Sequence, residues 1–266
     1  MSVTVNNIVK LIITSLLALT MVACVTVTES RMTKKASPEK AVENYTELGL
    51  GYLDRDRPDL ARKRIEKALS IDNKYAPAND AMGLLWQTEG EFDLAEEFFK
   101  KALSQDKSYT RARHHLGNLY LQQKRFEQAE KDLLKAANDR YYDDRSLAYS
   151  DLAMMYFRQD KLDDAIKYYK ETLRLSPYNA QALVNISTLY FENQNYDESQ
   201  RYFNRLDRLV ERGQMIHTAH SLWLGIKLST IKQDTERAIV LATGLKRNYP
   251  ESSEYKLYQE SLSGAK

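Results

Sequence analysis

The chain has 266 residues, 43% of them hydrophobic and 29% charged, which is enough for one large domain or an elongated array of repeats. Lysine and arginine total 39 against 37 aspartate and glutamate residues with the two signs interleaved, so the sequence lacks the basic footprint of a nucleic-acid-binding protein. A single cysteine excludes an internal disulfide, and the low content of glycine and proline (9 and 5 residues) favours an all-α fold.

The first 23 residues are predicted to be a lipoprotein signal peptide. Residues 11–23 form an apolar run of 13 residues after Lys10, shorter than the roughly 20 residues that a membrane-spanning helix needs. The run leads into LTMVAC, which resembles a bacterial lipobox, so Cys24 is expected to be the lipid attachment site and the first residue of the mature protein. An uncleaved inner-membrane anchor with an incidental cysteine is the alternative.

Residues 24–41 are polar and show no helical stripe, which predicts a flexible tether between the lipid and the folded domain. One acyl chain alone binds a membrane only marginally, but the several chains that the lipobox resemblance implies on Cys24 would anchor the protein stably. Val25 stands where an aspartate commonly retains such lipoproteins at the inner membrane. The resemblance therefore implies attachment to the periplasmic face of the outer membrane of a Gram-negative bacterium.

A small residue recurs from residue 49 onward at intervals of 34, 34, 36, 34 and 38 residues. An apolar residue precedes each of them, and an apolar or aromatic residue follows three positions later. A helix accepts residues of low helix propensity where a second helix must approach closely. The positions predicted to pack the repeats are Gly49, Gly83, Gly117, Ala153, Ser187 and Gly225.

This pattern is typical of the tetratricopeptide repeat (TPR), a helix–turn–helix unit of about 34 residues. It predicts an all-α solenoid of six repeats that forms a right-handed superhelix. Residues 252–266 are expected to form a C-terminal capping helix and tail, and Gly51 falls on no repeat position. The repeats are predicted over 42–251, at about 42–75, 76–109, 110–145, 146–179, 180–217 and 218–251.

The sequence carries no glycine-rich phosphate loop, no zinc-type spacing of cysteine and histidine, and no nucleophile elbow. His114 and His115 are adjacent and should diverge on a helix. His217 and His220 could share a helix face, but no third metal ligand lies near them in the sequence. We therefore predict a protein that is not an enzyme and needs no cofactor, no metal and no small-molecule substrate.

Two longer connections, at 139–146 and 211–219, interrupt the repeat period. Each is either a recognition loop or a tolerated insertion. If the protein were an enzyme instead, its site would have to lie in these loops, but neither loop brings together an acid, a base and a nucleophile.

The first helices of stacked repeats form the inner wall of such a solenoid, and the exposed positions on this wall are unusually apolar here. An apolar groove predicts a peptide or helical segment with exposed hydrophobic side chains as the partner. The alternative is that some of these side chains are buried against neighbouring repeats. The predicted groove residues are Leu50, Leu53, Leu84, Leu121, Met154, Phe157, Val184, Phe191 and Ile226.

Several segments together resemble the type IV pilus biogenesis/stability lipoprotein family (PilW/PilF). They are ACVT at the lipidation site, YTELGLGYL and EKALSIDN in the first repeat, and the two C-terminal segments HSLWLGIKLS (220–229) and LKRNYPESSEYKLYQ (245–259). The C-terminal segments depart from the TPR consensus, so a generic TPR protein would not share them.

The resemblance implies a pilotin, an outer-membrane lipoprotein that helps the pilus secretin to reach the outer membrane and to multimerise. It implies that Cys24 carries the lipid and that the TPR groove receives a secretin subunit, and it brings no catalytic residues. The alternative is a TPR lipoprotein adaptor that scaffolds periplasmic cell-wall hydrolases or a protease.

Overall fold

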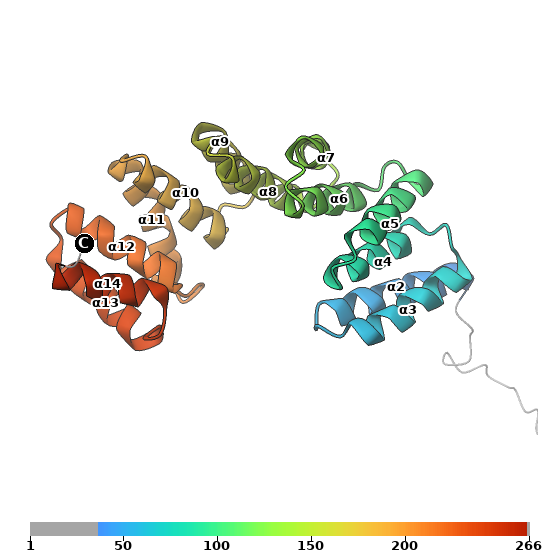
Figure 1. Ribbon diagram of the computed structural model, residues 1–266, viewed down its shortest axis with the longest axis horizontal. Helices are drawn as coiled ribbons and strands as arrows, with labels where there is room; N and C mark the ends of the chain where they lie inside the picture. The colour runs from blue at the N-terminus through green and yellow to red at the C-terminus, as the bar shows by residue number, and fades with distance from the viewer. Residues whose placement is uncertain (1–36, 265–266) are drawn as a thin grey trace, which may run out of the picture. The chain divides into compact units, whose positions relative to one another are not determined.

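The computed structural model describes residues 37–264, which contain thirteen helices and no strand (Figure 1). The predicted signal peptide, Cys24 and most of the predicted tether lie outside the described residues. The helices are α2 (Pro38–Leu53), α3 (Pro58–Ile71), α4 (Ala76–Thr88), α5 (Phe92–Gln105), α6 (Thr110–Gln122), α7 (Phe126–Asn138), α8 (Arg145–Arg158), α9 (Leu162–Leu175), α10 (Ala180–Glu192), α11 (Tyr196–Glu211), α12 (Ala219–Ile231), α13 (Thr235–Asn248) and α14 (Ser253–Ser263).

The helices form six successive pairs, from α2 and α3 to α12 and α13, and α14 packs against the last pair (Figure 1). From α3 onward each second helix also contacts the first helix of the following pair, and first helices contact one another at several junctions. The predicted all-α TPR solenoid is therefore confirmed. None of the helices in residues 37–264 is long and apolar enough to cross a membrane.

The first helix begins earlier than expected. The predicted tether extended to residue 41, but α2 starts at Pro38. Proline suits the first turn of a helix, because its missing N–H would have no partner there. The hydroxyl of Ser37 accepts a hydrogen bond from the backbone nitrogen of Lys40 at 3.3 Å, which caps this end.

The glycines of the repeat pattern lie where two helices touch. A Cβ added at Gly49 would lie 2.5 Å from Ile65, at Gly83 2.6 Å from the ring of Phe99, and at Gly117 2.8 Å from Leu133. The contacted side chains belong to the second helix of the same repeat. The structure thus confirms the close approach that the sequence predicted at these positions.

In the fourth, fifth and sixth repeats the small residue at the helix contact differs from the first three repeats in its type or in its neighbours. Ala153 and Ser187 are fully buried, and the Ser187 hydroxyl donates to the backbone oxygen of Ser199 at 2.8 Å. A Cβ added at Gly225 would lie 2.9 Å from Leu241 of its own repeat and 2.4 Å from Phe203 of α11. Phe203 therefore joins the fifth repeat to the sixth.

Gly51 differs from these glycines, because no atom outside its own helix lies within 4 Å of an added Cβ. We expect Gly51→Ala to raise the free energy of unfolding by about 0.5–1 kcal/mol, the usual gain for glycine to alanine in a helix. Gly83→Ala, the matched control, should lower it by about 1–3 kcal/mol through overpacking against Phe99. Urea unfolding followed by circular dichroism measures both, and a shift of both variants in the same direction would contradict the assignment.

Candidate functional site

A cleft of about 310 Å³ lies on the inner wall, the surface formed by the first helices of the repeats. Helices α8, α10 and α12 of the fourth, fifth and sixth repeats supply nearly all of its lining, and α9 supplies one tyrosine. The lining residues are Met154, Phe157, Arg158, Tyr169, Gln181, Asn185, Thr188, Leu189, Glu192 and His220.

Two predicted groove residues, Met154 and Phe157, come together in this cleft. They lie three positions apart on α8 and therefore share a helix face. The Phe157 side chain is 41% exposed, although large apolar residues are usually covered. An Nη atom of Arg158 lies 3.6 Å from the sulfur of Met154. This part of the cleft offers an accessible apolar surface to a partner side chain.

The rest of the lining includes several polar side chains, of which the sequence analysis named only His220. The amide of Gln181 donates to the side-chain oxygen of Asn185 at 2.8 Å, and Asn185 donates to the hydroxyl of Tyr169 at 2.8 Å. Burial raises the pKa of Tyr169 to about 12 despite the hydrogen bond from Asn185, so Tyr169 remains a neutral phenol. Thr188 and the Nε2 atom of His220 lie 3.0 Å apart.

Charged groups stand only at the rim, where Arg158 and Glu192 are both exposed. The cleft therefore combines apolar side chains, hydrogen-bonding side chains and one acidic and one basic residue at its edge. This arrangement suits the side chains and backbone of a polypeptide segment better than an ion or a highly charged ligand.

Four other predicted groove residues, namely Leu50, Leu53, Leu84 and Phe191, lie outside this cleft. They are half-buried and pack against the hydrophobic core of their own or neighbouring repeats. The ammonium of Lys227 lies 4.3 Å from the centre of the Phe191 ring. Burial lowers the pKa of Lys227, although the charge of Glu192 opposes this shift.

The prediction is wrong for Leu121, Val184 and Ile226 as accessible groove residues. Their exposed fractions are 5%, 7% and 4%, so a partner does not reach them in this conformation. Their side chains are members of the hydrophobic core, which is the alternative that the sequence left open.

The histidines are held by neighbouring side chains. His114 and His115 were expected to diverge, but their rings lie nearly parallel with their centres 6.2 Å apart. They have different partners: His114 contacts Tyr142 at 2.8 Å and Asp151 at 2.7 Å, whereas His115 contacts Asp80 at 2.8 Å. His217 lies 2.9 Å from Asp207. Within residues 37–264 no group of three or more potential ligands is placed to hold a metal ion.

Comparison with known proteins agrees with the repeat pattern. Models of the tetratricopeptide repeat match residues 76–109, 108–177 and 156–214. They leave the first and the last repeat unmatched, although both form the same helix pair in the structure.

The chain is similar over nearly its whole length to a pilus protein. It is 32% identical over 245 residues to the type IV pilus assembly protein PilF of Pseudomonas aeruginosa, covering 92% of this chain and 95% of that protein. The solved structure of Pseudomonas aeruginosa PilF superposes with a TM-score of 0.76 over 84% of this chain and 99% of that one. The crystal structure of PilW, a type IV pilus biogenesis factor, shares the fold with a TM-score of 0.71 at 22% identity, over 82% and 98% of the two chains. The chain therefore belongs to the PilF/PilW family of type IV pilus assembly proteins.

Proposed function

We propose that this protein is a pilotin, an outer-membrane lipoprotein that binds a subunit of the pilus secretin and promotes its localisation and multimerisation in the outer membrane. The observation that carries the proposal is the near full-length similarity to a pilus assembly protein. The apolar cleft on the inner wall supports it, because an assembly factor of this kind must hold a hydrophobic segment of its client.

The cleft would hold such a segment by two kinds of contact. An apolar side chain of the secretin subunit would rest on Met154 and Phe157, where burial of exposed apolar surface favours binding. The amides of Gln181 and Asn185 would hydrogen-bond its backbone. No residue acts as an acid, base or nucleophile in this proposal. The segment would be released when subunits of the oligomer bury it against one another.

Replacing Met154 and Phe157 by aspartate tests the cleft. We expect the affinity for the purified secretin subunit to fall at least about tenfold, because two apolar contacts of the binding surface become charged. The measurement is a titration of the full-length protein in nanodiscs by microscale thermophoresis. Tyr178→Asp is the matched control, since Tyr178 is 67% exposed but does not line the cleft.

The lipid anchor is tested separately. We expect Cys24→Ala to leave secretin binding in solution unchanged and to remove the protein and secretin multimers from the outer-membrane fraction. If Cys24→Ala still supported normal multimers in that fraction, lipidation would not direct the secretin. If the folded double aspartate variant bound the secretin normally, the binding site would lie elsewhere on the array.

A further inference from the structure

A second groove follows α11, the second helix of the fifth repeat, and its other side comes from α13 and, at one end, from Lys232 after α12. It consists of three adjoining clefts of about 580, 340 and 390 Å³. The first two share Asp207 and Arg237, and the last two share Gln200, Asn204 and Lys232, so the clefts form one continuous groove. It has no lining residue in common with the inner-wall cleft.

The groove lies where the longest interval of the repeat pattern falls. Their packing positions, Ser187 and Gly225, are 38 residues apart, and the additional residues form the connection between α11 and α12. The hydrophobic core of the sixth repeat is a cluster of its own, which reaches the fifth repeat mainly through Phe203 and Phe191. The connection supplies Ile216 to one side of the groove.

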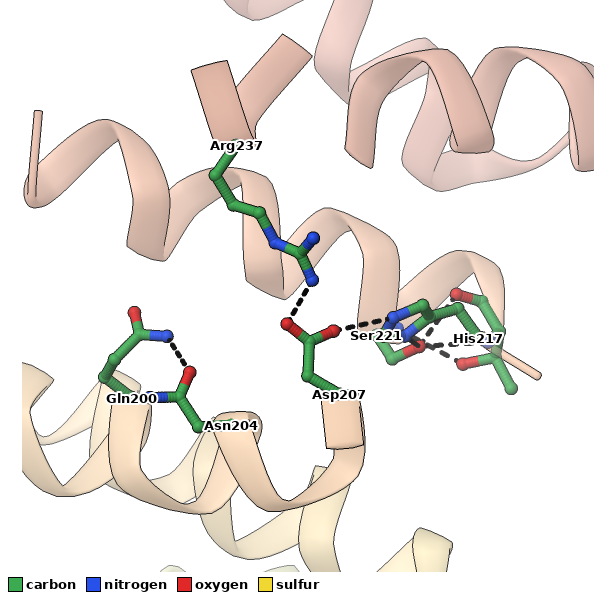
Figure 2. A network of polar contacts seen from close by, with 7 residues as sticks. Gln200, Asn204, Asp207, His217, Ser221 and Arg237 are labelled. Carbon is green, nitrogen blue, oxygen red and sulfur yellow. Dashed lines mark hydrogen bonds and ion pairs between the residues drawn. The ribbon is translucent and has the colours of Figure 1, made fainter. Parts of the chain in front are cut away.

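Asp207 of α11 lies in the middle of the groove and contacts both the connection that precedes α12 and helix α13 (Figure 2). One carboxylate oxygen lies 2.9 Å from Nε2 of His217, and the other pairs with the guanidinium of Arg237. Burial alone would raise the pKa of Asp207, but the hydrogen bond from His217 and the charge of Arg237 lower it below its ordinary value. Asp207, His217 and Arg237 therefore pair with one another and fix the middle of the groove. A partner would be recognised by the residues at the two ends.

One end of the groove is apolar. Its lining includes Val210, Leu222 and Leu241 together with two well-exposed side chains, Ile216 at 81% and Val240 at 54%. Single exposed apolar residues are common on protein surfaces, but two that face one cleft mark a binding surface.

The other end is positively charged. Four basic residues line it against a single acidic one, Asp197, which pairs with Lys232. Arg205 donates only to the backbone oxygen of Pro177, and Arg208 has no acidic partner within the described residues. The side chains of Gln200 and Asn204, which line the same cleft as these arginines, hydrogen-bond each other at 2.7 Å. Figure 2 shows this amide pair. This end therefore attracts a negatively charged group and also offers amides to a backbone.

We propose that this groove binds an extended segment of a partner protein in which acidic residues adjoin apolar ones. The groove follows α11 from Asp197 to Val210, a distance of about 20 Å, which accommodates about six extended residues. The acidic residues lie at Arg205 and Arg208, and the apolar side chains lie between Ile216 and Val240. The groove is separate from the inner-wall cleft, so this inference does not rest on the proposed secretin binding.

Selection from a random peptide library on the full-length protein in nanodiscs of a zwitterionic lipid tests the proposal. We expect enriched peptides that combine acidic and apolar residues within about six positions. In fluorescence anisotropy titrations of such a peptide, Arg208→Glu and Val240→Asp should each weaken binding at least about tenfold. Two neighbours serve as matched controls that leave binding unchanged, namely Arg212→Glu and Ile239→Asp, because both residues are exposed but do not line the groove.

Four outcomes would overturn the proposal. Enriched peptides could lack acidic residues, or their binding could be insensitive to both groove substitutions. If Phe157→Asp abolished the binding of the enriched peptides, these peptides would occupy the inner-wall cleft. That result would not contradict the proposed function. Binding of phosphatidylglycerol vesicles that Val240→Asp abolishes, without any peptide enriched, would assign the groove to an anionic lipid surface instead.

Discussion

Phe99→Ala is expected to lower the free energy of unfolding by about 3–5 kcal/mol, the usual cost of removing a buried aromatic side chain. Phe99 is fully inaccessible to solvent, and its ring packs directly on Gly83 of the first helix of the same repeat. Its loss leaves a cavity between α4 and α5, and both helices take part in the contacts with the third repeat. Guanidinium unfolding followed by circular dichroism measures the change.

A double-mutant cycle with Gly83 tests the reason for this loss. Gly83→Ala alone is unfavourable because the new methyl group meets the Phe99 ring at 2.6 Å. In the Phe99→Ala background the methyl group instead fills part of the cavity and gains helix propensity, so Gly83→Ala should become neutral or stabilising. The expected coupling is about 1–3 kcal/mol. Additive effects of the two substitutions would show that the small residue is not required by this contact.

The repeat architecture was predictable because close packing of two helices imposes the same demand in every repeat. A side chain larger than serine does not fit at these positions, so the period stands out in the sequence even where the residue changes from Gly117 to Ala153. The same demand does not apply to Gly51, which meets no neighbouring helix, and its role could not be assigned from the sequence.

The accessible part of the inner wall was predictable only in part. Helical periodicity tells which residues share a face, but it does not tell how far the next repeat covers that face. Met154 and Phe157 stay accessible beside the wide cleft at α10, whereas Val184 and Ile226 are covered by the core. Tyr169 comes from a second helix and enters the cleft only through the way the repeats stack.

The groove along α11 could hardly be predicted from the sequence. The longer interval was visible, but whether an added connection opens a groove depends on the packing around it. The arginines of α11 alternate with acidic residues along the chain, so the even overall charge concealed their clustering at one end of the groove. The spacing of charges on a helix face carries information that the net charge lacks.

Asp207→Asn is expected to destabilise the sixth repeat by about 2–3 kcal/mol. This is less than the cost of breaking a fully buried ion pair, because the Arg237 side chain is 34% exposed. Asp207 itself is only 9% exposed, and asparagine lacks its charge and has one acceptor oxygen where the carboxylate has two, so Arg237 and His217 cannot both keep their acceptor. Since the sixth repeat has its own core cluster, the effect should be local. Hydrogen exchange should become faster in α12, α13 and α14 and remain unchanged in α4–α7.

A second aspartate of α11 provides the control for this prediction. Asp197 also pairs with a cation of the sixth repeat, Lys232, but its side chain is 89% exposed, so Asp197→Asn should hardly change the stability. The pH dependence follows from the lowered pKa of Asp207. Its contribution is complete above the unfolded-state value of about 3.9 and is lost as the pH falls through the lower folded-state value. The difference between wild type and Asp207→Asn should therefore shrink on acidification below about pH 4. An equal effect of both substitutions, or exchange that accelerates evenly along the array, would mean that Asp207 does not hold the sixth repeat to the fifth.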